Sequence, residues 1–108
     1  MRREDVIAKL RAHADAIASF GVTTLYLYGS VARDEAGDQS DVDLFADVDY
    51  DRFGFVSFMD LREFLASLLG RKVDFTTRQA LHPDLKERIV RSAIKVLDNA
   101  SVDPVPVE

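Results

Sequence analysis

The chain has 108 residues, enough for one domain with a hydrophobic core but too few for a catalytic domain joined to a separate substrate domain. It contains no cysteine, which excludes disulfides, thiolate chemistry and cysteine-based zinc sites, and its formal net charge is -5. No apolar run approaches membrane-spanning length and the amino terminus lacks the apolar region of a signal peptide, so we expect a cytoplasmic protein without membrane contact.

The first predicted element is a helix over residues 4–20. Its apolar residues recur at helical spacing, with charged residues elsewhere on the helical wheel: Val6, Ile7, Leu10, Ala14 and Ile17. Gly21 is expected to end this helix as its C-cap. We interpret His13 as a surface residue rather than a ligand, because no second motif residue accompanies it.

Residues 25–28 form a short apolar and aromatic run that stops at Gly29, as a buried strand entering a tight turn does. A short helix over residues 30–35 and a loop over residues 36–40 are expected next. Glycine lets the backbone approach an anion closely, and the free amides at a helix start carry partial positive charge. Gly29 and Ser30 are therefore predicted to hold a phosphate, with an ordinary turn capped by serine as the alternative.

The second predicted strand, residues 41–46, is apolar except for Asp41 and Asp43. Side chains alternate between the two faces of a strand, so these two carboxylates point the same way, with attachment points about 7 Å apart. Two carboxylates at that spacing can share one or two hard cations. A buried strand does not tolerate two like charges unless a metal or solvent offsets them, so we predict a metal site here.

Acidic residues crowd this part of the chain, with eight in eighteen positions: Asp34, Glu35, Asp38, Asp41, Asp43, Asp47, Asp49 and Asp51. Such a negative field repels a phosphate backbone, so direct nucleic-acid binding is not expected here. It also repels a nucleotide triphosphate unless divalent cations accompany it, which predicts metal dependence. We interpret Asp47, Asp49 and Asp51 as a solvated rim, in which one carboxylate could support the metals indirectly.

A second long helix is predicted over residues 53–69 and is expected to end at Gly70. Its core stripe consists of apolar residues at helical spacing: Phe58, Leu61, Leu65, Leu68 and Leu69. The other aromatic residues of this segment are interpreted mainly as core, with a surface for a partner as the alternative.

Asp74 lies in the middle of a third predicted strand, residues 71–77, between apolar neighbours. If this strand lies beside the one that carries Asp41 and Asp43, all three carboxylates share one face; the alternative is an edge-strand residue that faces solvent. Three carboxylates opposite a phosphate-holding turn suit metal-assisted phosphoryl or nucleotidyl transfer. Magnesium usually binds through a couple of carboxylates plus substrate phosphates, and a metal pair can stabilise both attacking and leaving oxygens.

The last predicted element is a helix that starts at residues 82–84 and runs to about residue 97. Its buried side is expected to consist of Leu85, Ile89, Ala93 and Val96 or Leu97. Helices and strands then alternate in the order αβαβαβα, which predicts an α/β fold with a short mixed sheet flanked by helices. We assign residues 1–98 to this single domain and residues 99–108 to a flexible tail.

These motifs together resemble the signature of the polymerase-beta-like nucleotidyltransferase superfamily. Residues 29–33 (GSVAR) and residues 40–44 (SDVDL) match it, with ten residues between the Gly-Ser pair and the Asp-x-Asp pair. Residues 70–74 (GRKVD) supply a later strand aspartate. The similarity is to the minimal nucleotidyltransferase group and covers roughly residues 3–97.

The resemblance implies a magnesium-dependent transfer of AMP from ATP, with a small nucleotidyltransferase fold. Asp41, Asp43 and Asp74 would be the catalytic residues and the ligands of two Mg²⁺ ions, and Asp74 would also draw the proton from an acceptor hydroxyl. Gly29 and Ser30 would hold the terminal phosphates of ATP.

Two further residues of the motif are candidates for nucleotide binding. Arg33 could contact a phosphate or the base, with a surface ion pair to Asp34 or Asp38 as the alternative. Ser40, which directly precedes the Asp-x-Asp pair, is the second candidate.

Members of the minimal group are often antitoxins paired with HEPN ribonuclease toxins. The resemblance therefore implies a HEPN toxin as partner, with a tyrosine that is adenylylated and thereby silenced. A chain this short is expected to complete its acceptor site with a second protein, or with another copy of itself. Two alternatives are a non-catalytic adaptor that neutralises its partner by binding, and a nucleotidyltransferase that acts on a small molecule such as an antibiotic.

Overall fold

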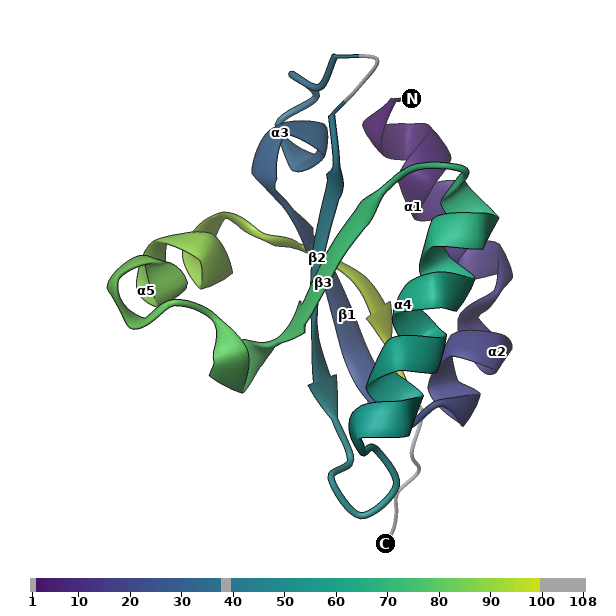
Figure 1. The fold of residues 1–108 in the computed structure, drawn as a ribbon. Helices are drawn as coiled ribbons and strands as arrows, with labels where there is room; N and C mark the ends of the chain where they lie inside the picture. Colours follow the sequence, from purple (N-terminus) through teal and green to yellow (C-terminus); the bar gives the residue numbers. More distant parts are fainter. Residues whose placement is uncertain (1, 38–39, 100–108) are drawn as a thin grey trace, which may run out of the picture.

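The structure is a computed structural model in which residues 2–37 and 40–99 are described. They form a four-stranded sheet with helices on both faces and a short helix at one end (Figure 1). In chain order the elements are α1 (Arg3–Ala12), α2 (Ala14–Ser19), β1 (Val22–Tyr28), α3 (Gly29–Ala32), β2 (Val42–Val48), α4 (Phe55–Leu69), β3 (Val73–Thr77), the 3-10 helix η1 (Arg78–Ala80), α5 (Pro83–Ser92) and β4 (Ile94–Asp98).

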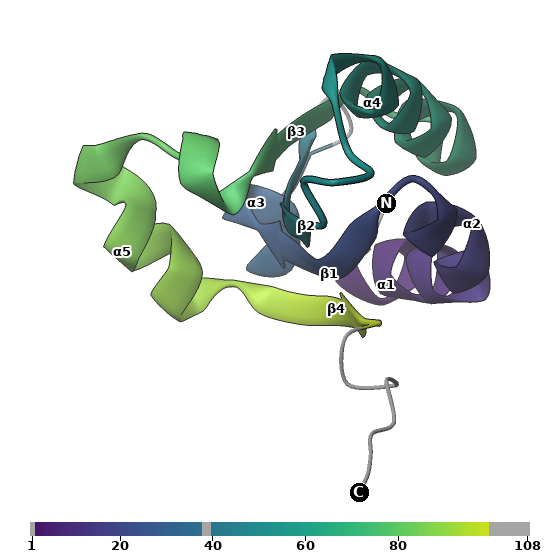
Figure 2. The same ribbon diagram turned by 90° about the horizontal axis from the view of Figure 1, so that it is seen from below.

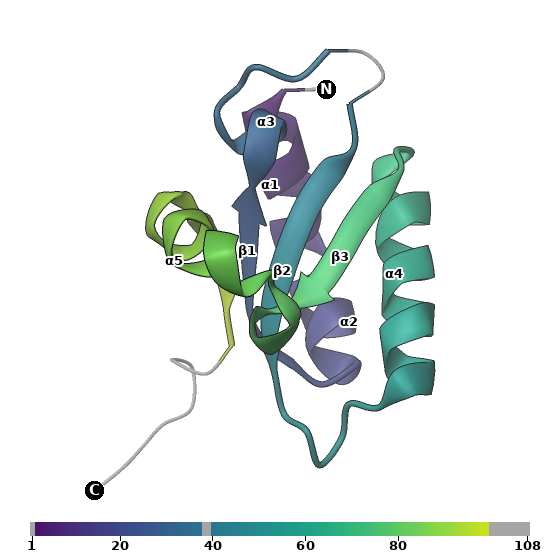
Figure 3. The same ribbon diagram turned by 60° about the vertical axis from the view of Figure 1, so that its left-hand side comes forward.

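The strand order is β3-β2-β1-β4. β2 and β3 are parallel and are joined by α4, whereas β1 is antiparallel to both of its neighbours, β2 and β4. The predicted short mixed sheet flanked by helices is therefore confirmed. This pairing brings the end of β1 and the starts of β2 and β3 to the same end of the sheet, next to α3 (Figure 3).

The helices are distributed unequally over the two faces of the sheet. α1, α2 and α4 cover one face, and α5 lies alone on the other, as the view along the sheet shows (Figure 2). No helix of the described residues is both long enough and apolar enough to span a bilayer.

The face covered by α1, α2 and α4 carries most of the hydrophobic core. Val42, Leu44 and Ala46 alternate along β2, are completely buried and belong to one cluster with Leu61 and Leu65 of α4. Because neighbouring side chains of a strand point to opposite faces, the residues between these three point toward the face of α5. The acidic motif thus lies on the face opposite the core.

The predicted second long helix is confirmed, and its bounds have clear causes. It begins at Phe55, two residues later than predicted, with Gly54 in an extended conformation as its N-cap. It ends at Gly70, which has a φ of 64° in the left-handed region and whose amide donates to the carbonyl of Ala66 at 2.9 Å. Glycine adopts this conformation without the clash that a β-carbon would cause.

The predicted helix over residues 4–20 is two helices, α1 and α2. The break lies at His13, whose φ of -116° and ψ of 28° leave the helical region. Its amide donates to the carbonyl of Leu10, three residues back, which tightens the chain at this point. Leu10 and Ile17 are both completely buried on either side of the break. The short helix predicted over residues 30–35 is also shorter than expected, since α3 has four residues.

The prediction that the last helix continues to residue 97 was wrong. The helix ends at Ser92, Ala93 is extended, and residues 94–98 form β4. β4 pairs with the free edge of β1, where Leu25 lies opposite Leu97. An available sheet edge therefore overrides the helical pattern. No residue of α5 is buried, so the predicted burial of Leu85 and Ile89 on this helix was wrong, whereas Val96 and Leu97 are buried as expected but lie in β4. Of the predicted tail, residues 100–108 lie outside the described residues.

Replacing Leu65 with alanine should lower the free energy of unfolding by about 2–5 kcal/mol, because it leaves a cavity in the core beneath α4. Urea denaturation measures the change. Leu85→Ala is the matched control on α5, where the side chain is 42% exposed, and it should change the free energy of unfolding by less than about 0.5 kcal/mol. Equal effects of the two variants would contradict this assignment of the core.

Candidate active site

Two aspartates lie side by side at the end of the sheet next to α3. Asp43 of β2 is directly opposite Asp74 of β3 in the parallel register, so both side chains project from the same face. Asp41 lies two residues before Asp43, just ahead of the first residue of β2. The structure thus brings Asp43 and Asp74 together as expected, with Asp41 close enough to act on Asp43 electrostatically. Their catalytic and metal-binding roles stay predictions.

The charges at this point repel one another. Burial, together with the neighbouring carboxylates of Asp74 and Asp41, raises the pKa of Asp43 to about 6, while Arg33 acts in the opposite direction. Tyr28 of β1 lies opposite Asp43 on its other side. Burial, Asp74 and Asp43 raise the pKa of Tyr28 to about 12. A cation bound among these groups would relieve the repulsion between the carboxylates.

Gly29 packs closely against Asp43. Its φ of 77° lies in the left-handed region, and a β-carbon at this position would overlap the carboxylate of Asp43, whose own β-carbon would be only 3.2 Å away. No side chain caps the start of α3, and the Ser30 hydroxyl has no hydrogen-bond partner among the described residues. The predicted turn therefore packs directly against the predicted metal site, and its hydroxyl is available.

The other two predicted nucleotide contacts are engaged within the protein. Arg33 Nε lies 2.9 Å from a carboxylate oxygen of Glu35, and both side chains are largely exposed. This is a surface ion pair, as the alternative interpretation proposed, although with a different acid. The Ser40 hydroxyl accepts a hydrogen bond from the amide of Gly37 at 2.9 Å, and its carbonyl accepts one from Arg71 at 2.8 Å. Ser40 therefore closes the loop before β2, and nucleotide binding by both residues stays a prediction.

Asp47 does not belong to a solvated rim, as the sequence had suggested. Arg78 donates two hydrogen bonds to its carboxylate, at 2.6 and 2.9 Å, and the Thr24 hydroxyl donates a third at 2.6 Å. The hydrogen bond from Arg78 is the main reason that the pKa of Asp47 is lowered. The Arg78 guanidinium also lies 5.1 and 5.2 Å from the ring centroids of Tyr26 and Phe45, which stack on each other.

Sequence reasoning missed this network, although one signal for it exists. The period of two that places Asp41 and Asp43 on one face continues through Phe45 to Asp47. Arg78 follows β3 directly and lies across the same face. The network fixes the chain at the point where it leaves β3 toward α5, and thereby sets how α5 crosses the face that carries the acids.

The chain matches the model of the nucleotidyltransferase domain family over residues 10–96. Among curated relatives, the protein adenylyltransferase MntA of Thermococcus cleftensis is 32% identical over 95 residues, which cover 86% of this chain and 94% of the relative.

Solved structures with the same fold include a chain proposed to be a minimal nucleotidyltransferase, with a TM-score of 0.76, 33% identity and coverage of 87% of this chain and 95% of that one. A toxin-antitoxin complex with AMP-PNP gives a TM-score of 0.66 at 22% identity, over 94% of this chain and 77% of that one. A complex of the tri-AMPylated HEPN toxin of Shewanella oneidensis with its MNT antitoxin gives a TM-score of 0.63 at 19% identity, over 93% of this chain and 76% of that one.

The family match covers most of the chain and includes β1, β2 and β3, the strands that carry the predicted site. The curated relative exceeds 30% identity over nearly its whole length. The acidic pair and the glycine turn thus lie in the part of the chain that the family shares. The chain therefore belongs to the nucleotidyltransferase domain family.

Proposed function

We propose that this nucleotidyltransferase transfers AMP from ATP to a tyrosine hydroxyl of a HEPN toxin, and so acts as its antitoxin. The observation that carries the proposal is the pairing of Asp43 with Asp74 against the turn at Gly29. The relative from Thermococcus cleftensis is named a protein adenylyltransferase, which supports a protein as acceptor. The fold shared with antitoxins in toxin complexes supports the choice of partner.

The residues present fit magnesium. Asp43 and Asp74 offer paired oxygen donors, and Asp41 lies nearby. Burial and then the charges of Asp74 and Asp41 raise the pKa of Asp43, and a cation would offset both effects. Within residues 2–37 and 40–99, no group of three or more acidic or histidine side chains is arranged to hold a metal ion. Magnesium usually takes one or two carboxylates together with substrate phosphates, so the phosphates of ATP would have to complete the site. We expect Asp41, Asp43 and Asp74 to hold two Mg²⁺ ions with ATP.

The residues of this chain divide the reaction between them. The turn at Gly29 and Ser30 holds the terminal phosphates of ATP. Asp74 accepts the proton of the acceptor hydroxyl, whose oxygen forms a bond to the α-phosphorus while the bond to the departing pyrophosphate breaks. Bound Mg²⁺ would supply neutralisation of the charge that develops on the phosphates. Positioning and charge stabilisation then provide most of the rate.

The cytoplasmic location expected from the sequence stays a prediction.

Mass spectrometry of a HEPN toxin, after incubation with this protein, ATP and Mg²⁺, tests the proposal. We expect the toxin to gain the mass of one or more AMP groups on tyrosine, and the gain to disappear when a chelator removes the metal. Binding of the toxin without any gain in mass would instead show neutralisation by occlusion, and would refute the catalytic proposal.

Replacing Asp43 or Asp74 with asparagine should reduce AMP transfer by roughly a hundredfold or more, because the site loses a metal ligand or the group that accepts the proton. Both variants should keep the fold, since these side chains lie opposite the core face. Transfer is followed with radiolabelled ATP. Asp60→Asn, an exposed carboxylate on α4, is the control and should retain full activity. Full activity of Asp43→Asn would remove this residue from the mechanism.

Gly29→Ala should lose AMP transfer, because its β-carbon would displace the carboxylate of Asp43. Gly70→Ala is a matched control: Gly70 also has a left-handed φ, at 64°, but nothing lies within 4 Å of the added carbon. Both variants should lose stability by about 1–2 kcal/mol from backbone strain, and only Gly29→Ala should lose activity. Thermal denaturation and the transfer assay separate the two effects, and equal activity of both variants would contradict the expectation.

The metal-free protein should lose stability relative to Asp43→Asn as the pH rises. The pKa of Asp43 in the fold, about 6, exceeds its ordinary value of 3.8. Protonation of Asp43 therefore stabilises the fold fully below pH 3.8, and this contribution is lost as the pH rises through about 6. Between these limits we expect the difference in free energy of unfolding between the wild type and Asp43→Asn to change by about 1 kcal/mol, after allowance for solvent screening.

Urea denaturation in the presence of chelator, repeated from about pH 3 to pH 8 (~5 units, wide enough to span both pKa values), measures this difference. A difference between wild type and Asp43→Asn that stays constant across the series would show that Asp43 is not destabilised by its neighbours. The pH dependence of the wild type alone would not isolate Asp43, because the lowered pKa of Asp47 changes the free energy of unfolding with pH in the opposite direction.

A further inference from the structure

A groove of about 470 Å³ lies between the turn at the end of β1 and the helix α5. Residues from both sides line it: Tyr28, Gly29 and Arg33 on one, and Leu85, Arg88 and Ile89 on the other. Gly29, which packs against Asp43, is among the residues that line this groove, so the groove adjoins the acidic pair. Sequence reasoning gave α5 no part in the site.

Two guanidinium groups face this groove in a chain whose net charge is -5. Arg33 is paired with Glu35 at the surface. Arg88 has no ion-pair partner among the described residues; only its backbone carbonyl is engaged, by the Ser92 hydroxyl at 3.1 Å. An unpaired arginine beside a groove is available to bind an anion, and its planar fork matches the oxygens of a phosphate.

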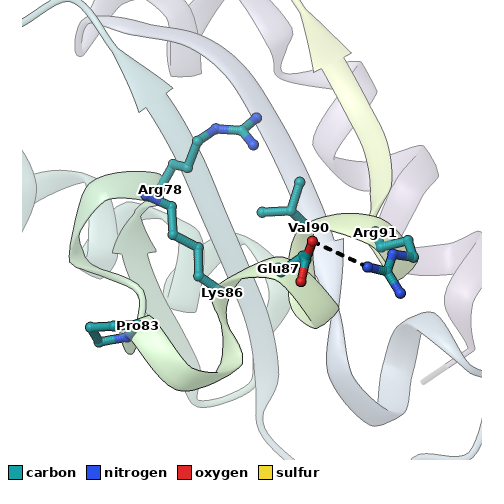
Figure 4. Close-up of a pocket in the computed structure, with 6 residues that line it drawn as sticks. All are labelled: Arg78, Pro83, Lys86, Glu87, Val90 and Arg91. Carbon is teal, nitrogen blue, oxygen red and sulfur yellow. Dashed lines mark ion pairs between the residues drawn. The ribbon is translucent and has the colours of Figure 1, made fainter.

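The other arginine of α5, Arg91, lines a different hollow and has an ion-pair partner. Arg78, Lys86, Glu87 and Arg91 are among the residues that line it, and none of the predicted site residues does (Figure 4). Arg91 forms an ion pair with Glu87 at 3.4 Å, one turn back along the helix. Arg91 is therefore the paired counterpart of Arg88, on the same helix but in a different hollow.

We propose that Arg88 binds the β- and γ-phosphates of ATP from the α5 side of this groove, opposite Arg33. The inference rests on the proposed function, in which the α-phosphorus reacts next to Asp43 and Asp74. The pyrophosphate leaves on the side of the α-phosphorus opposite the attacking hydroxyl, and the groove that Gly29 lines offers it two guanidinium groups. A nucleobase, which carries no charge, would not need two guanidinium groups. By its charge, Arg88 stabilises the pyrophosphate as it leaves.

Calorimetric titration of the full chain with ATP, AMP and inorganic pyrophosphate, each with Mg²⁺, tests the proposal. Arg88→Ala should bind ATP and pyrophosphate roughly ten- to a hundredfold more weakly, as expected for the loss of a charged hydrogen bond, and should bind AMP as the wild type does. Arg88→Lys should recover part of the affinity for ATP, because it keeps the charge but not the fork. Arg91→Ala, the matched control, should bind all three ligands normally.

Two results would overturn the proposal: unchanged affinity of Arg88→Ala for ATP, or an equal loss for AMP and ATP, which would place Arg88 at the nucleoside. Misfolding is not expected to confuse the result, because no residue of α5 is buried, and thermal denaturation checks this. AMP transfer by the wild type in the same preparations keeps the two proposals apart. If the wild type transfers AMP and Arg88→Ala binds ATP normally, only the role of Arg88 is refuted. If the wild type transfers no AMP, the proposed function is refuted.

Discussion

The parallel pairing of β2 with β3 sets Asp43 directly beside Asp74, and the rest of the site depends on this register. A slip by one residue would turn a carboxylate toward the face where Val42 and Leu44 are completely buried, which is prohibitively costly for a charge. The core therefore specifies the register, and the register specifies the site. The helix α4 serves both purposes, because it connects the two strands and packs its leucines against β2.

The two faces of the sheet have different tasks. The face covered by three helices supplies the hydrophobic stabilisation, and the face under α5 holds like charges close together, which opposes folding. Burial and these neighbouring charges both raise the pKa of Asp43, which reflects that opposition. The turn at Gly29 approaches the carboxylate of Asp43 so closely that no larger residue fits there. A small domain tolerates such a site only because its other face is well packed.

Local patterns predicted the parts of the site that lie within one strand or turn. The period of two over residues 41–43 placed both aspartates on one face, and the position of Gly29 after an apolar run placed the turn. The missed features join distant segments: the pairing of β4 with β1, the hydrogen bonds of Arg78 to Asp47, and Arg88 across the groove. The period of two could have placed Asp47 on the acidic face, but its partner and the other contacts depend on which sheet edge is free and where a helix crosses the sheet, and local patterns specify neither.

The helix α5 contributes no buried residue, and it is attached through its ends, by Arg78 on one side and by β4 on the other. Folding therefore places few demands on its ten residues. Changes in their charge or size would reshape one wall of the groove while the sheet keeps its stability. Evolution can thus adjust ligand preference in this helix almost independently of the scaffold, with the acidic pair held constant.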